Sequence, residues 1–442
     1  MRILYSLSLL VLSLNTLWGQ SAFHLSKHKQ RVEIPFTLLN NLIFIPIKVN
    51  GEELTFLLDT GVDETILFSL DDQEQIKFFE VEKIKLKGLG SKEAIDAYRA
   101  TKNTMDAHGF VDENHEIYLV LDQEFTISLQ VGIPVNGIIG YHFFKNHSVA
   151  IDYERRKVMV YAEENTKLAK KLKRKFAVNA MPVEEHKPYV FSTIALNGKK
   201  LSSKLLVDTG NSDALWVFLH TAKAFTKPEQ TVHDYLGKGF SGEIYGLRGR
   251  VSQFDFGHTL FDHPISTFPD SVSVQSVNFV PDRVGSIGGE VLSRFDLVFD
   301  YPNQVLYTRP NGKVREPFNY NMSGIQIEHA GLEWTREVEE PRSQDIKVYT
   351  TASEERLLYN IQHRFVLKPI FNIAMVRLGS SAQVAGLKKG DRIITINGRY
   401  AHQYSMERIN ELLKSEEGRT ISMEIERNGV VMEFKFQLKS IL

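Results

Sequence analysis

The 442-residue sequence contains no cysteine. Disulfides, thiol catalysis, cysteine-ligated metal sites and a lipid-modified amino-terminal cysteine are therefore excluded. A folded chain of this composition must be stabilised by the packing of its cores. The absence also fits a bacterial envelope compartment better than a secreted animal protein.

The chain also has no large excess of positive or negative charge. Its 53 lysines and arginines nearly balance its 54 aspartates and glutamates, and the formal net charge is −1. This balance argues against a nucleic-acid-binding protein, so we expect polypeptide partners and no nucleic acid. Beyond the amino terminus no stretch approaches the roughly 18 apolar residues of a membrane span. We therefore expect no stable membrane span once a leader is removed.

Two common catalytic motifs are absent or incomplete. No His-Glu-x-x-His occurs among the 14 histidines, so we assign no metal and no cofactor. Gly210-Asn211-Ser212 begins like the nucleophile loop of serine proteases, but Asp213 stands where that loop needs a glycine. A serine mechanism is therefore not expected.

The amino terminus has the pattern of a secretory signal. Met1-Arg2 precedes the apolar run 3–14, and Leu17-Trp18-Gly19-Gln20 resembles a cleavage region. We assign residues 1–20 to a signal peptide. The mature protein is then expected in the periplasm or cell envelope of a Gram-negative bacterium, or secreted from it.

The triplet Asp-Thr-Gly occurs twice, at Asp59-Thr60-Gly61 and at Asp208-Thr209-Gly210, each time directly after an apolar run. About 80 residues beyond each aspartate comes an apolar residue followed by glycine, Ile139-Gly140 in the first half and Ile287-Gly288 in the second. Two matched carboxylates in matched contexts indicate a catalytic dyad.

The repeat extends beyond these triplets. Asp152-Tyr153 in the first half is answered by Asp300-Tyr301 in the second, so the offset between positions 153 and 301 is nearly the same as that between positions 59 and 208. A constant offset indicates duplicated lobes. We place lobe 1 at residues 21–165 and lobe 2 at residues 166–312.

Between each aspartate and its later glycine lies a glycine-rich segment. Glycine clusters at a hairpin tip allow positive φ and close backbone approach, which suits a flap over a bound chain. The expected substrate-binding flap residues are Gly88, Leu89, Gly90, Gly239, Phe240 and Gly242.

The doubled pattern over residues 30–312 resembles the pepsin and retropepsin superfamily of aspartic peptidases, in the bacterial two-lobed form that is exported and carries a PDZ module. The resemblance implies that Asp59 and Asp208 are catalytic and that they activate a water for peptide-bond hydrolysis. It also implies that the threonine and glycine of each triplet support the site. Because one chain supplies both aspartates, no dimer is required.

The sequence departs from this family directly after each triplet. Many members have Ser or Thr there, and its hydroxyl lowers the pKa of the pair, whereas this chain has Val62 and Asn211. Losing that donor should leave the pKa of the dyad higher. We therefore expect a pH optimum nearer neutral than that of pepsin.

From about residue 313 the duplication ends, and residues 379–398 resemble the core of a PDZ domain. A short helix stopped by Gly386, a turn, a strand and the Asn397-Gly398 hairpin signal follow one another. We assign residues 313–442 to this domain, with an insertion near residues 333–355. A peptide or protein end would bind in its groove.

The groove is expected between a helix at residues 407–413 and a strand at residues 370–376, where a peptide adds by β-augmentation. The carboxylate loop is placed at residues 365–367. The expected groove residues are Phe365, Val366, Leu367, Ile373 and Ile409.

These observations predict a mainly β fold, in which duplicated pepsin- or retropepsin-like β-barrel lobes form a bilobal unit followed by an α+β PDZ domain. The expected function is that of an exported aspartic endopeptidase acting on polypeptides, with the PDZ recruiting or regulating substrate. Two alternatives stay open: a non-catalytic peptide-binding protein and an envelope scaffold on the same fold.

Overall fold

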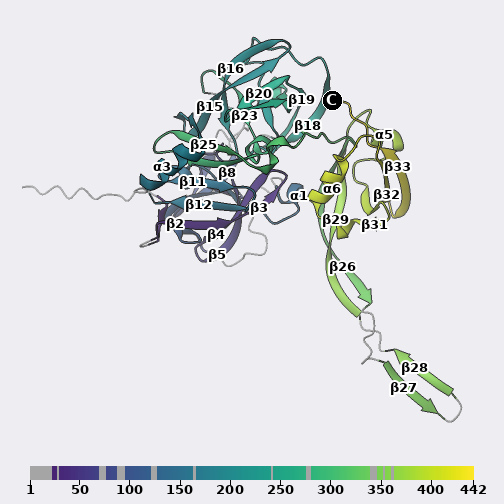
Figure 1. Cartoon of the computed structure of the whole chain (residues 1–442). Coiled ribbons are helices and arrows are strands. Elements are labelled where there is room, and N and C mark those ends of the chain that lie inside the picture. Colours follow the sequence, from purple (N-terminus) through teal and green to yellow (C-terminus); the bar gives the residue numbers. More distant parts are fainter. Residues whose placement is uncertain are drawn as a thin grey trace, which may run out of the picture.

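The computed structural model describes residues 22–442 apart from residues 27–28, 69–75, 87–94, 121–126, 163–165, 240–241, 275–279, 339–345, 352–353 and 360–362. Two β-rich lobes lie against each other, and a smaller third domain lies beside them (Figure 1). The predicted leader lies outside the described residues. Within them, no helix is long and apolar enough to cross a membrane.

Lobe 1 is built on one sheet whose central strands are buried. Strand β5 ends at Leu58, directly before Asp59, and it runs parallel to β10. In spatial order the strands are β1 (His24–Leu25), β9 (Phe110–Leu119), β6 (Ile66–Leu67), β10 (Gly137–Ile139), β5 (Glu52–Leu58), β4 (Leu42–Val49), β8 (Ile95–Ala107) and β7 (Val81–Leu86), with β3 (Thr37–Leu39) on β4. Helices α1 (Ile127–Val131) and α2 (Tyr141–Phe144) flank β10 in the chain.

Lobe 2 repeats this arrangement. Strand β16 ends at Val207, directly before Asp208, and it runs parallel to β23. In spatial order the strands are β18 (Thr231–Gly239), β19 (Gly242–Arg250), β22 (Ile265–Pro269), β17 (Leu215–Val217), β23 (Arg283–Ile287), β16 (Lys199–Val207), β15 (Lys187–Leu196), β20 (Gln253–Phe256) and β21 (Thr259–Asp262), with β14 (Val183–Glu184) on β15. Helix α4 (Gly289–Leu292) follows β23, and 3-10 turns occur at Ser271–Val274 and Gly312–Arg315.

A third sheet joins the lobes and takes three strands from each half. Its order is β2 (Arg31–Pro35), β12 (Lys157–Tyr161), β11 (Ser148–Asp152), β24 (Phe295–Asp300), β25 (Val305–Pro310) and β13 (Ala177–Ala180). The halves meet where Ala150 of β11 lies opposite Val298 of β24. The predicted mainly β, duplicated and bilobal fold is thus confirmed.

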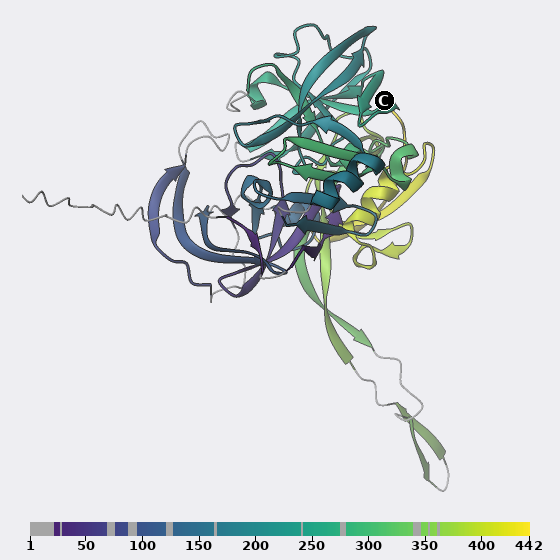
Figure 2. The ribbon, with the colours of Figure 1, turned by 60° about the vertical axis from the view of Figure 1, so that its left-hand side comes forward.

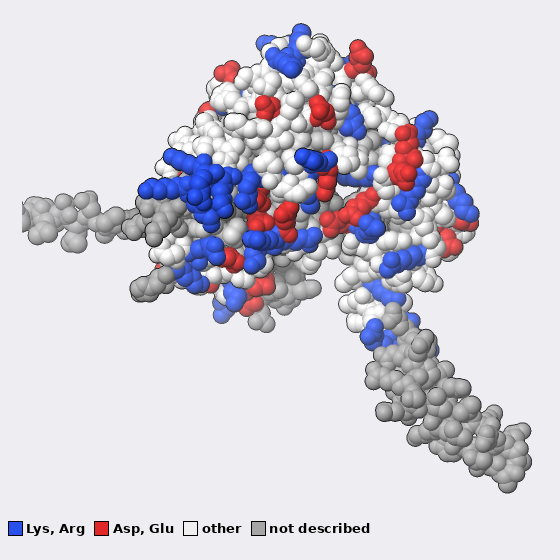
Figure 3. All heavy atoms as spheres, viewed as in Figure 1, with Lys and Arg blue, Asp and Glu red and all other residues white. Residues whose placement is uncertain are grey.

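Helix α3 (Thr166–Lys175) connects the halves and covers one face of this shared sheet. Leu172 packs with Ala150 and Val298, while the last turn of the helix is basic. Figure 3 shows a blue cluster where the basic last turn of α3 lies.

The third domain has its own hydrophobic core and a sheet in the order β26 (Ile325–Val338), β29 (His363–Val376), β30 (Arg392–Ile396), β32 (Thr420–Arg427) and β33 (Val430–Gln437), with β31 (Arg399–Tyr400) on β30. Helices α5 (Ser381–Ala385) and α6 (Met406–Leu413) cover it, with a 3-10 turn at Ala401–Gln403. Both helices are N-capped by serine, Ser380 and Ser405, as the spacing of their sequences favours.

The insertion expected near residues 333–355 falls on a hairpin arm of this domain. Strands β26 and β29 continue as one long arm to Val338 and His363, where these two residues pair. A separate hairpin, β27 (Ile346–Thr351) and β28 (Glu354–Tyr359), lies between these two residues in the chain. Figures 1 and 2 show this arm pointing away from the lobes.

The predicted groove was wrong in two respects. Strand β29 lies inside the sheet, between β26 and β30, so both its edges are paired. The edge strand of the sheet is β26, which contacts α6 and also α1 of lobe 1. Phe365, Val366 and Leu367 are not a loop but part of β29, paired with Trp334, Thr335 and Arg336. An alternating pattern identifies a strand but does not say whether it is central or at an edge, which is the physical reason for the error. Ile373 and Ile409 are fully buried core residues.

Candidate active site

The two aspartates leave the ends of equivalent strands. The backbone N–H of Asp59 donates to the carbonyl oxygen of Ile139 at 2.9 Å, and that of Asp208 donates to Ile287 at 2.9 Å. Each carboxylate then accepts a hydrogen bond from the glycine two residues on, Gly61 at 2.7 Å and Gly210 at 3.1 Å. The predicted glycines therefore supply amides to the carboxylates.

The carboxylates meet across the interface between the lobes. A Cβ atom added to Gly210 would lie 2.1 Å from Oδ2 of Asp59, and one added to Gly61 would lie 3.2 Å from Oδ1 of Asp208. Each carboxylate thus lies against the backbone of the opposite triplet. Only glycine leaves space for this approach.

The threonines of the triplets are buried and cross between the lobes. The hydroxyl of Thr60 donates to the carbonyl oxygen of Val207 at 2.6 Å, and that of Thr209 donates to Leu58 at 2.8 Å. Each hydroxyl therefore bonds the strand end that carries the opposite aspartate. This contact fixes the two strand ends relative to each other.

The later glycines lie under the two segments that start at the aspartates, residues 59–62 and 208–213, which we call the active loops. A Cβ atom on Gly140 would lie 2.2 Å from the carbonyl oxygen of Val62, and one on Gly288 would lie 2.2 Å from that of Asp213. A side chain at either position would displace backbone, so both loops depend on glycine there.

A tight turn of each lobe also reaches the other lobe. The turn of lobe 1 contacts the active loop of lobe 2, and the turn of lobe 2 contacts helix α2 beside the active loop of lobe 1. The side-chain amide of Asn41 donates to the carbonyl oxygen of Ser212 at 3.1 Å, and the ring of His186 stacks on Tyr141 at 4.3 Å between centroids. Both contacting residues have positive φ, at 64° and 65°. The sequence analysis missed these contacts, although Asn at positions 40 and 41 is a hairpin-turn signal.

Burial raises the pKa of both carboxyl groups. Burial, followed by the charge of Asp208, raises the pKa of Asp59 to about 8. Burial also raises the pKa of Asp208, against the opposing effect of the Arg283 guanidinium and of the Gly210 and Asn211 N–H groups. The pair therefore retains a proton to higher pH than an isolated aspartate does.

Arg283 was not identified from the sequence. It lies on β23, is 8% exposed, and stacks over the ring of Phe218 at 5.3 Å. A buried cation 75 positions from the aspartate that it affects carries no local sequence signal.

The predicted flaps correspond to hairpins at equivalent positions. In lobe 2, β18 and β19 pair up to Gly239 opposite Gly242, while Phe240 lies outside the described residues. In lobe 1, β7 and β8 pair up to Leu86 opposite Ile95. Gly88, Leu89 and Gly90 also lie outside the described residues.

Two protein families match separate parts of this chain. The aspartyl protease family matches residues 45–143, which include Asp59, and the PDZ domain family matches residues 373–427. The crystal structure of an aspartic proteinase from Irpex lacteus aligns at a TM-score of 0.41 and 12% identity, over 65% of this chain and 100% of that one. A search of curated proteins found no match. The chain therefore combines a domain similar to aspartyl proteases with a carboxyl-terminal domain similar to PDZ domains.

Proposed function

We propose that the protein is an aspartic endopeptidase that hydrolyses peptide bonds with Asp59 and Asp208. The observation that carries this proposal is the crossed arrangement of the triplets, in which each carboxylate lies against the glycine of the other lobe. Two carboxyl groups held this way share one proton, because both cannot ionise in a buried site.

The two carboxyl groups have different roles in this mechanism. Ionised Asp208 takes a proton from a water, whose oxygen attacks the carbonyl carbon of the peptide. Protonated Asp59 donates to the carbonyl oxygen, so the tetrahedral intermediate carries no net oxyanion. In the collapse of this intermediate, Asp208 gives its proton to the amide nitrogen, Asp59 takes a proton back from a hydroxyl of the intermediate, and the C–N bond breaks to release the amine and the carboxylic acid.

Cleavage of casein by purified residues 21–442 tests the proposal. We expect Asp59→Asn and Asp208→Asn each to abolish cleavage, because either change removes the shared proton or its acceptor. Asp255→Asn is the matched control, since Asp255 is an exposed aspartate on β20. Cleavage that persists in either dyad variant would contradict the mechanism.

No cleavage by the unaltered protein, together with retained peptide binding, would favour a non-catalytic peptide-binding protein. Loss of the cellular role on deleting residues 313–442, but not in the dyad variants, would favour an envelope scaffold.

We also propose that the protein is exported, on the basis of the charged and apolar pattern of residues 1–20. Expression in a Gram-negative bacterium with fractionation tests this, and mass spectrometry of the mature amino terminus locates the cut. A cytoplasmic product that keeps Met1 would contradict it.

A further inference from the structure

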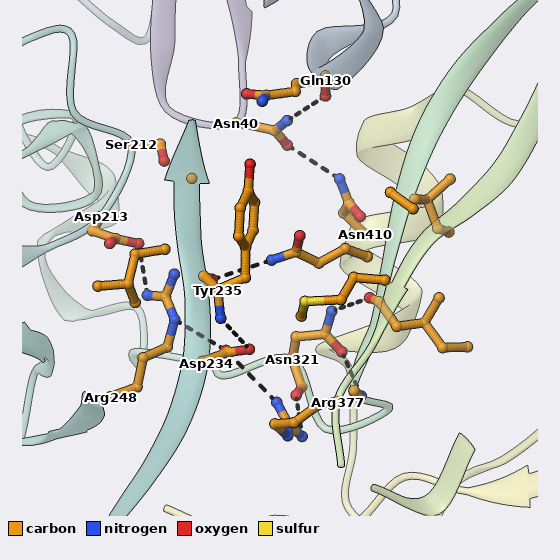
Figure 4. A pocket seen from close by; sticks show the side chains of 18 of the residues that line it. Asn40, Gln130, Ser212, Asp213, Asp234, Tyr235, Arg248, Asn321, Arg377 and Asn410 are labelled. Carbon is orange, nitrogen blue, oxygen red and sulfur yellow. Dashed lines mark hydrogen bonds and ion pairs between the residues drawn. The ribbon is translucent and has the colours of Figure 1, made fainter. Parts of the chain in front are cut away.

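The PDZ domain contacts both lobes across a cleft of about 640 Å³ (Figure 4). On the lobe 1 side, the side-chain amide of Asn410 on α6 donates to Oδ1 of Asn40 at 3.3 Å. On the lobe 2 side, the amide of Gln326 on β26 donates to the carbonyl oxygen of Tyr235 on β18 at 3.3 Å. The edge strand β26, which also contacts α1 of lobe 1, therefore forms one wall of this cleft.

A chain of ion pairs runs from the PDZ domain into lobe 2. Arg377, at the end of β29, lies 3.8 Å from Oδ2 of Asp234 on β18. The same oxygen is 3.2 Å from Nε of Arg248 on β19, and Nη1 of Arg248 lies 2.8 Å from Oδ1 of Asp213. Figure 4 shows these four side chains in one line.

This chain is largely shielded from solvent. Arg377 is 6% exposed and Asp234 is 8% exposed. Tyr320, in the segment between the domains, donates to Asp234 at 2.8 Å and accepts a hydrogen bond from the Arg377 guanidinium. Screening by salt is weak for such pairs, and removing one partner leaves a buried charge uncompensated.

Asp213 is the point where the chain reaches the active loop. It follows Gly210 by three residues, and its backbone N–H donates to Oδ1 of Asn211 at 3.0 Å. Its Oδ2 accepts from Trp216 at 2.7 Å and from Thr267 at 3.0 Å. Arg248 therefore fixes a loop that begins with Asp208.

Arg377 also contacts the segment that leads into β26. Its backbone N–H donates to the carbonyl oxygen of Gly324 at 2.8 Å, and its guanidinium donates to that of Asn321 at 3.4 Å. One residue thus joins the segment before β26 to Asp234.

We propose that the PDZ domain positions the active loop of lobe 2 through Arg377, which is a positioning residue and not a catalytic one. The proposal rests on the proposed peptidase function. Arg377 holds Asp234, Asp234 orients Arg248, and Arg248 holds Asp213. A shift of the segment at residues 321–325 is then transmitted to the loop that carries Asp208.

The experiment uses residues 21–442, in which Trp216 and Trp334 are the two tryptophans. Trp334→Phe leaves Trp216 as the single reporter, and its indole bonds Asp213 directly. In this background Arg377→Met is compared with Arg427→Met. Arg427 pairs with Asp391 inside the PDZ domain, so the control removes a similar ion pair without touching the lobes.

We expect Arg377→Met to shift the Trp216 emission and to lower kcat on casein about tenfold, since displacement of catalytic groups by less than 1 Å has effects of this order. Arg427→Met should change neither. Asp234→Asn should reproduce the Arg377→Met effect, and the double variant should be no worse than either single one, because both act through one link.

Equal emission and equal kcat in the Arg377 and Arg427 variants would overturn the proposal, as would additive effects in the double variant. The emission is measurable whether or not casein is cleaved. If the peptidase proposal is wrong, no variant cleaves casein. The Trp216 emission of the Arg377 and Arg427 variants can still be compared in that case, and it decides whether Arg377 positions the active loop.

Discussion

Thr60 and Thr209 each accept a hydrogen bond from the backbone N–H of the other, both at 3.1 Å. Together with the bonds that their hydroxyls donate, this gives four cross-lobe hydrogen bonds, all in a buried position. The reciprocity explains why the two carboxylates stay matched although they come from different lobes.

Thr60→Val and Thr209→Val should each destabilise the bilobal unit by about 2–4 kcal/mol, because each leaves a buried N–H and a buried carbonyl without a partner. Valine keeps the shape, so the loss reports the hydrogen bonds. Thermal unfolding measures it, with exposed Thr193→Val on β15 as control. Serine at either position should retain most of the stability, and a stable valine variant would contradict the role of the crossed bonds.

The pH dependence of kcat/KM follows from the two shifted carboxyl groups. In the proposed mechanism, cleavage requires Asp59 protonated and Asp208 ionised. With the pKa of Asp59 raised to about 8, activity should fall above about pH 8, and on the acid side it should fall as Asp208 is protonated. We expect a maximum nearer neutral than that of pepsin, and a maximum well below about pH 4 would contradict this.

Arg283→Met tests the acid side of this profile. The guanidinium lowers the pKa of Asp208, so its removal should move the acid limb to higher pH and narrow the profile. Arg309→Met, which removes an ion pair with Asp296 away from the dyad, should leave both limbs in place. An unchanged acid limb in the Arg283 variant would contradict the assignment.

Asp59→Asn should make the protein more stable at neutral pH. The folded-state pKa of Asp59 is raised above its unfolded value, so folding retains a proton that the unfolded chain releases, and stability falls as pH rises from about 4 towards about 8. The variant escapes this loss. We expect a gain of up to about 4 kcal/mol at pH 7, from about 1.4 kcal/mol per pH unit above the unfolded pKa, and almost none near pH 4. Thermal melts at both pH values, with Asp255→Asn as the control, measure this difference.

Gly210→Ala should reduce kcat more than Gly61→Ala does. The new methyl group at position 210 would overlap the Asp59 carboxylate at 2.1 Å, whereas at position 61 the nearest oxygen is at 3.0 Å. We expect a loss of roughly 100-fold or more for Gly210→Ala, because the clash moves a catalytic group. Gly312→Ala, which meets only the flexible end of Glu154, is the control. Equal activity in both triplet variants would refute this asymmetry.

The dyad could be predicted from the sequence because the evidence for it is local and repeated. This evidence is the two triplets, the two later glycines and the constant spacing between the two halves. It did not reveal Arg283, Asn41 or Arg377, since each acts on a residue at least 75 positions away and none belongs to a repeated pattern. The strand expected beside the PDZ groove was misassigned because strand order within a sheet is set by tertiary pairing.

The shared sheet has a consequence for how the molecule could be assembled. Each half contributes three contiguous partners, and a single seam, β11 against β24, connects them. A polypeptide severed between Ala162 and Thr166 would therefore leave two fragments that each keep a complete half-sheet. Mixed together, such fragments should complement one another, and the halves would then behave as the two unlike subunits of a heterodimer.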